Sequence, residues 1–176
     1  AALSSWGHSV PMVMGQLQGP SKFLCGNYKN VHYKAQILET EFSPERDRIV
    51  YQLAEAYDCK ELKSLTREFL LDRLEGRIQI TDHVEYTKPG SYEAAFTTLC
   101  QVLITLRGFD LLNDSAGVQV HVDRNLFDLT IAPIKEIVIE DQTRPLYPLR
   151  VALVTKKPLK TGKFQYEIKP IKEIAP

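Results

Sequence analysis

The sequence predicts an all-β protein, an antiparallel layered β-sandwich with little helix. Three segments alternate apolar and polar residues as a strand with one buried face does: 31–37, 77–86 and 118–123. Further short runs rich in strand-forming residues occupy 92–99, 127–131, 134–139, 149–155 and 164–168. Turn-forming residues interrupt the chain between runs, at 88–90, 113–115 and 160–162. Many short strands at this spacing, without regularly alternating long helices, favour a sandwich.

Length and charge narrow the class of protein further. The 176 residues are expected to form one β-sandwich domain, 1–176. A chain of this length can bury roughly two thirds of the surface that its unfolded form exposes, so it needs neither metal nor disulfides to fold. The 22 basic and 22 acidic residues balance, which argues against nucleic-acid binding. No apolar run is long enough to span a membrane. The start at Ala1, without an initiator Met or a signal peptide, leads us to expect a fragment or a processed chain.

One segment, 43–74, leaves two structures open. Ser43, Pro44 and Glu45 fit a helix N-cap, a proline at the first helical position and an acid in the first turn. Apolar residues then continue at helical spacing. The same residues also allow two strands, 49–57 and 62–72, broken at 58–60. Periodicity alone does not decide between them.

His8 is the candidate metal ligand of the chain. It lies among small and polar residues, ahead of a short apolar strand and a turn at Gly15. A histidine so placed can face a cleft or bind a metal, although it can also pack on Trp6 or face solvent. The other histidines fall on the polar side of alternating strands, where solvated side chains are expected: His32, His83 and His121.

The three cysteines, Cys25, Cys59 and Cys100, are widely spaced and form no C-x-x-C pair. We expect buried small side chains or free thiols, and one disulfide with a leftover thiol is the alternative. Cysteine usage therefore does not fix the redox compartment.

Several polar residues within the expected strands have structural explanations. Asp82 points inward, where a carboxylate is costly unless paired, so we expect it to accept hydrogen bonds from Arg67 or from backbone amides. Tyr57 is expected in the core. Phosphate-binding loops, a nucleophile elbow and a closely spaced carboxylate pair are all missing from the sequence, so no catalytic residue is assigned.

Four motifs, in order, resemble the C-terminal domain of heparinase II/III-like polysaccharide lyases. Residues 5–11 (SWGHSVP), continuing to Gly15 and Gln18, are similar to a His-Asn/Ser-x-Val/Pro, Gly, Gln signature, with Ser9 where Asn is common. Residues 53–57 resemble a D-L-T-x-A-Y strand, and 67–69 an R-x-F strand. Residues 78–84, the fourth motif, resemble the strand that closes this hairpin. In addition to these four motifs, residues 150–170 are similar to the terminal strand pair. This resemblance favours strands over 49–72.

The resemblance implies a larger enzyme, in which an N-terminal toroid of helices packs with the β-sandwich and uronic-acid-containing glycans are cleaved by β-elimination. It implies that His8 is one ligand of a structural metal, usually zinc, whose other ligands precede this chain; this fragment by itself needs no metal. The toroid and an acidic polysaccharide are the implied partners, and a homodimer of the parent is also expected. The parent would be periplasmic or secreted, and the chain alone inactive.

Two further expectations follow. In such a lyase, the basic hairpin formed by Lys156, Lys157, Lys160 and Lys163 could guide an acidic glycan, whereas elsewhere it would be a solvated turn. The alternative to a lyase domain is a non-catalytic β-sandwich module that binds carbohydrate or mediates subunit contact, in which His8 is only structural.

Overall fold

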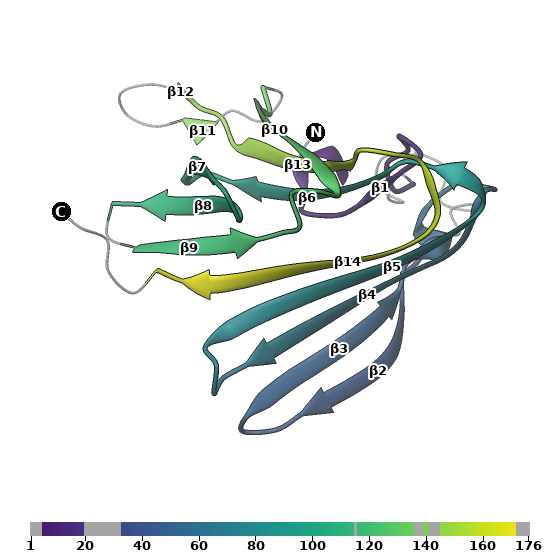
Figure 1. Ribbon diagram of the computed structural model, residues 1–176, viewed down its shortest axis with the longest axis horizontal. Helices are drawn as coiled ribbons and strands as arrows, with labels where there is room; N and C mark the ends of the chain where they lie inside the picture. The colour runs from purple at the N-terminus through teal and green to yellow at the C-terminus, as the bar shows by residue number, and fades with distance from the viewer. Residues whose placement is uncertain (1–4, 20–32, 115, 136–138, 141–144, 172–176) are drawn as a thin grey trace.

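The structure is a computed structural model that describes residues 5–19, 33–114, 116–135, 139–140 and 145–171. Two antiparallel sheets lie against each other (Figure 1). The larger sheet has eight strands, in the order β2 (Gln36–Phe42), β3 (Arg46–Gln52), β4 (Leu62–Asp72), β5 (Arg77–Gly90), β14 (Leu159–Pro170), β9 (Ala116–His121), β8 (Gly108–Asn113) and β7 (Gln101–Thr105).

The smaller sheet has four strands, in the order β1 (Met12–Val13), β6 (Tyr92–Thr98), β13 (Leu149–Thr155) and β10 (Phe127–Pro133). A separate strand pair consists of β11 (Ile139–Glu140) and β12 (Pro145–Leu146). Two short 3-10 turns, η1 (Ser5–Gly7) and η3 (Ala54–Ala56), are also present. Strands make up 65% of the structure and helices 4%, which confirms the prediction of an all-β sandwich. Within the described ranges, no helix is long and apolar enough to cross a bilayer.

Residues 43–74 form strands, as the motif resemblance favoured. The Ser43 hydroxyl accepts a hydrogen bond from the Arg46 amide at 3.1 Å, so the residues that also fitted a helix cap form a hairpin turn between β2 and β3. Strand β4 has the predicted bounds, 62–72. The strand predicted at 49–57 is shorter than expected, because β3 ends at Gln52 and η3 follows.

Other strand boundaries differ from the prediction. The strand predicted at 31–37 is confirmed only at its end, because β2 begins at Gln36 and residues 33–35 are not in a strand; residues 31 and 32 lie outside the described residues. Ile134 and Lys135 are not in a strand, and residues 136–138 of that predicted run are not described. The predicted turns at 88–90 and 160–162 are in fact parts of β5 and β14, which pair with each other there through a bulge.

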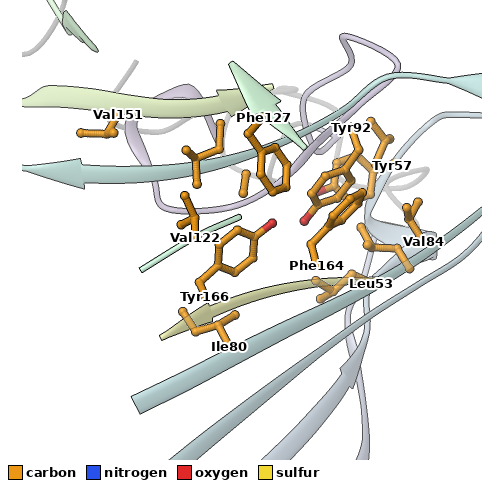
Figure 2. Close-up of a cluster of buried hydrophobic side chains, with 14 of the residues drawn as sticks. Leu53, Tyr57, Ile80, Val84, Tyr92, Val122, Phe127, Val151, Phe164 and Tyr166 are labelled. Atoms are coloured by element: carbon orange, nitrogen blue, oxygen red, sulfur yellow. The ribbon is translucent and has the colours of Figure 1, made fainter. Parts of the chain in front are cut away.

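Aromatic side chains fill the core between the two sheets (Figure 2). Tyr92 of the smaller sheet stacks on Phe164 of the larger sheet, with ring centroids 4.8 Å apart. Phe127 of β10 lies 5.1 Å from the same Phe164 ring, and Phe96 of β6 lies 5.4 Å from Phe109 of β8. These contacts bury aromatic rings between the two sheets, which stabilises the fold.

The larger sheet extends beyond the smaller one at β2, β3 and β4 (Figure 1). The strand registers place Phe69 beside Ile80, a core residue, so Phe69 belongs to the inner face, which faces the smaller sheet. On that face Phe42 is 66% exposed and Ile37 57% exposed, and Ile78 and Phe69 are also exposed. We call Ile37, Phe42, Phe69 and Ile78 the apolar overhang.

Candidate functional site

Residues Ser5–Gln18, within the first described segment, form an N-terminal strap along the smaller sheet. Its strand β1 pairs with the start of β6, placing Val13 opposite Tyr92, and the Val13 side chain is fully buried. Met14 and Gly15 then form a two-residue turn with positive φ at both positions, 51° and 74°. This confirms the turn expected at Gly15. The Gln18 amide donates to the Ser5 hydroxyl at 3.0 Å and so closes the strap.

Arg150 of β13 anchors the strap on one side. It is 2% exposed, and its guanidinium donates to the Glu93 carboxylate at 2.6 Å. The same guanidinium lies 4.5 Å from the centroid of the Trp6 ring, within the range of a cation–π contact. It also donates to the backbone carbonyls of Trp6, at 2.9 Å, and of His8, at 3.3 Å. The backbone of His8 is therefore held by a buried cation.

Arg67 of β4 is the second anchor. Its guanidinium makes a bidentate ion pair with Asp82 of β5, at 2.7 and 2.8 Å, and the Asp82 side chain is fully buried. Its remaining nitrogen donates to the Ser9 carbonyl at 3.1 Å. The Tyr92 hydroxyl also donates to Asp82. The prediction that Asp82 is paired with Arg67 is confirmed, and the pair also holds the strap, which was not foreseen.

Two further contacts complete the attachment of the strap. The Tyr57 hydroxyl donates to the Pro11 carbonyl at 2.7 Å, and the Thr97 amide donates to the Ser9 hydroxyl at 2.8 Å. Tyr57 is buried, as predicted. Burial raises the pKa of Tyr57 and of Tyr92 above the usual value. Both hydroxyls therefore stay protonated and act as hydrogen-bond donors, not as bases.

The His8 side chain is exposed on the strap. Among the residues that the structure describes, no group of three or more His, Cys, Asp or Glu side chains lies close enough to hold a metal ion. The assignment of His8 as a metal ligand therefore stays a prediction. His83 is exposed on β5, His121 is half-buried with its Nδ1 3.5 Å from Glu167, and His32 lies outside the described residues.

The cysteines take no part in this site. Cys59 is buried and Cys100 half-buried, and both are free thiols, in keeping with the expectation for these two. Cys25 lies outside the described residues, so its state stays a prediction.

Sequence reasoning missed the role of Arg150. The signal that could have found it is a single charge within the apolar run of β13, 149–154. A charged residue among core residues needs a partner. Its partners, Glu93 and Trp6, lie 57 and 144 residues away in the sequence. Nothing in the sequence around either residue indicates that it contacts Arg150.

The chain matches no family model and no curated protein by sequence. By structure it is similar to heparan sulfate lyase HepC from Pedobacter heparinus, with a TM-score of 0.71 at 12% identity over 97% of this chain. It is also similar to two heparinase III structures, with TM-scores of 0.68 and 0.61 at 10% and 13% identity, over 94% and 95% of this chain. The chain spans 25% of HepC and 24% of each heparinase III chain. It therefore has the β-sandwich fold that makes up about a quarter of these lyases.

Proposed function

We propose that this chain is the C-terminal β-sandwich part of a heparinase II/III-like polysaccharide lyase, which cleaves uronic-acid-containing glycans by β-elimination. The observation that carries the proposal is the meeting of the resembling motifs in space. The strap, Tyr57, Arg67 and Asp82 come from separate motifs, and they contact one another within a fold shared with solved lyases. This convergence is what a domain shared with those lyases predicts, and it supports the proposal.

The reaction requires a base that removes the proton next to the uronate carboxylate, a group that neutralises this carboxylate, and an acid for the leaving oxygen. The buried Tyr57 and Tyr92 are unsuited to the base, because their pKa values are raised and their hydroxyls are engaged. In this proposal the toroid of the parent supplies the reacting groups. The sandwich forms one wall of the cleft, and the parent acts in the periplasm or outside the cell.

The apolar overhang supports a larger parent. Its exposed side chains include Phe42 and Ile37, which lie on the face that elsewhere packs in the core. Exposed apolar side chains gathered on one face of a sheet are typical of an interaction site in soluble proteins. The part of the parent beyond this quarter-length unit is the proposed cover for it.

The first prediction concerns activity. The parent protein is expected to release unsaturated uronate products from heparan sulfate or another uronic-acid polymer, which ultraviolet absorbance detects. The isolated chain is expected to release none, because loss of even one reacting group lowers the rate by orders of magnitude. Product formation by the isolated chain would contradict the division of roles. A parent that lacks a helical toroid and is inactive on every such polymer would support a non-catalytic carbohydrate-binding module instead.

The second prediction concerns zinc and His8. The exposed imidazole of His8, on a backbone that is held in place, is suited to be one ligand of a zinc site. Tetrahedral zinc needs three or four ligands, and the rest of the parent would supply the others. The parent is expected to purify with zinc, and His8→Ala to remove it, as metal analysis would show. His83→Ala, which removes another exposed imidazole, is the control and should leave the zinc content unchanged.

The isolated chain should unfold at the same temperature with and without a chelator, because it holds one ligand of the site. The opposite result would be that the isolated chain binds one zinc ion and loses this binding in His8→Ala. That result would show that the site is complete within this chain, and the proposal of a shared site would be wrong.

A further inference from the structure

Two hollows open on the outer face of the larger sheet, the face turned away from the smaller sheet, and a third adjoins them beside the β13–β14 turn. All three are lined by Lys163. The strand registers place Lys163 of β14 opposite His83 of β5, and His83 opposite Thr66 of β4, so these side chains form a row across three strands. The hollow beside the β13–β14 turn has a volume of about 500 Å³ and is also lined by Lys156 and Lys157. We call the three hollows together the lysine track.

The track carries positive charge that the described part of the chain does not neutralise. Lys157 and Lys163 have no acidic partner among the described residues. The acids that line the track are already paired, Glu85 with Lys63 and Glu68 with Arg48. The chain as a whole has a net charge of zero, so this is a local excess of positive charge. Such a concave basic surface attracts anions.

One lysine of the track is held in place. The Lys156 ammonium donates to the Arg124 carbonyl at 2.8 Å, which links the β13–β14 turn to the loop that precedes β10. This contact fixes one rim of the largest hollow. A rim fixed before binding reduces the entropy lost when a ligand is held.

The remaining lining groups indicate the kind of anion. Gln79, Thr81 and Gln165 supply amides and a hydroxyl that can bond to sugar hydroxyls. Leu126 and Pro158 supply a small apolar surface suited to the C–H face of a sugar ring. No exposed aromatic ring lines the three hollows, so they lack the stacking platform on which single-stranded nucleic acids depend.

We propose that the lysine track binds the carboxylate or sulfate groups of an acidic polysaccharide chain. The choice of a glycan rests in part on the proposed lyase function, whereas the arrangement of cations does not. Lys163 is the central contact, because it borders all three hollows, and Lys157 extends the contact beyond the turn.

The test uses the 176-residue chain and a fluorescent heparin oligosaccharide, with binding followed by anisotropy. The double variant Lys157→Glu/Lys163→Glu is expected to bind at least about tenfold more weakly, because two attractions become repulsions. Its control is Lys60→Glu/Lys135→Glu, which makes the same change in net charge at exposed lysines outside the track. The control should bind nearly as the unchanged chain does. Lys163→Gln, which only removes a charge, should show a smaller loss than the double reversal.

Equal losses in both double variants would show attraction by net charge alone and would overturn the proposal, as would an unchanged affinity in the track variant. Tighter binding of a single-stranded oligonucleotide than of heparin would overturn the choice of a glycan. Thermal unfolding of each variant checks the fold, since exposed substitutions shift stability little. This assay measures binding of heparin and not its cleavage. A negative result for the lysine track can therefore be distinguished from a parent that lacks lyase activity.

Discussion

Asp82→Ala is expected to lower the free energy of unfolding of this chain by about 3–5 kcal/mol. The Asp82 side chain is fully buried, and its two oxygens accept both bonds of the Arg67 fork. Its removal leaves the guanidinium buried without a counter-charge and deprives the Tyr92 hydroxyl of its acceptor. Urea denaturation followed by circular dichroism measures the change.

Asp47→Ala is the matched control, because it also removes one carboxylate from an arginine pair on the larger sheet. The Asp47–Arg73 pair is open to solvent, which screens it, so the loss should be small. A loss for Asp82→Ala no larger than that for Asp47→Ala would contradict the structural role of the buried pair.

A double variant separates the two roles of Arg67, which pairs with Asp82 and also holds the strap at the Ser9 carbonyl. Replacing both partners by apolar residues, as in Arg67→Met/Asp82→Leu, should recover part of the stability, because no buried charge is then left unpaired. It cannot restore the bond from Arg67 to the Ser9 carbonyl. The double variant should therefore remain folded and yet expose the strap to proteases. Arg67 would then be required for strap position more than for stability.

The strands whose residues alternate between apolar and polar could be predicted from the sequence. In β5 the even positions Ile80, Val84 and Tyr86 are buried as expected, and Asp82 on the same face has the predicted partner. The hairpin of β7 and β8 was missed because its turn, Leu106–Arg107, has none of the usual turn residues. The positive φ of this connection, 146°, falls on Gly108, which adopts it without strain because it has no Cβ atom.

Two glycines misled the prediction because they serve packing and not turns. A Cβ atom on Gly162 would lie 2.6 Å from the Phe164 ring, so the absence of a side chain there lets that ring cover the strand. A Cβ atom on Gly90 would lie 2.6 Å from Met14, on the turn of the strap. A local sequence pattern cannot distinguish such close approaches from turns, because the atoms that impose them come from elsewhere in the fold.

The candidate site was foreseen only in its local parts. The turn at Gly15 and the pairing of Arg67 with Asp82 could be predicted from residue types and spacing. The role of His8 as a metal ligand rests on the family resemblance and stays a prediction. The Arg150–Glu93 pair could not be predicted, because it joins β13 to β6 and its third partner, Trp6, lies near the other end of the chain. Contacts between segments so far apart become visible only after the strands are in register.

Arg150→Ala is expected to lower the free energy of unfolding by about 3 kcal/mol, because Glu93 loses its partner inside the structure. It is also expected to release the strap, because the bonds to the Trp6 and His8 carbonyls and the contact with the indole disappear together. Arg150→Lys keeps the charge and loses the planar fork, so its effect should be intermediate.

Limited proteolysis distinguishes release of the strap from general unfolding. Under conditions in which Arg150→Ala is still folded, cleavage within Ser5–Gln18 should be faster than in the unchanged chain, and cleavage elsewhere should not be. Arg46→Ala, which breaks an exposed pair with Glu41 at the β2–β3 hairpin, should change neither stability nor strap cleavage by much. If the strap of Arg150→Ala resists protease as before, then Arg67, Tyr57 and Thr97 suffice to hold it. If it is released, the position of His8 depends on a buried cation in β13. If the parent is the proposed lyase with His8 in a zinc site, the same substitution should then weaken zinc binding without altering any metal ligand.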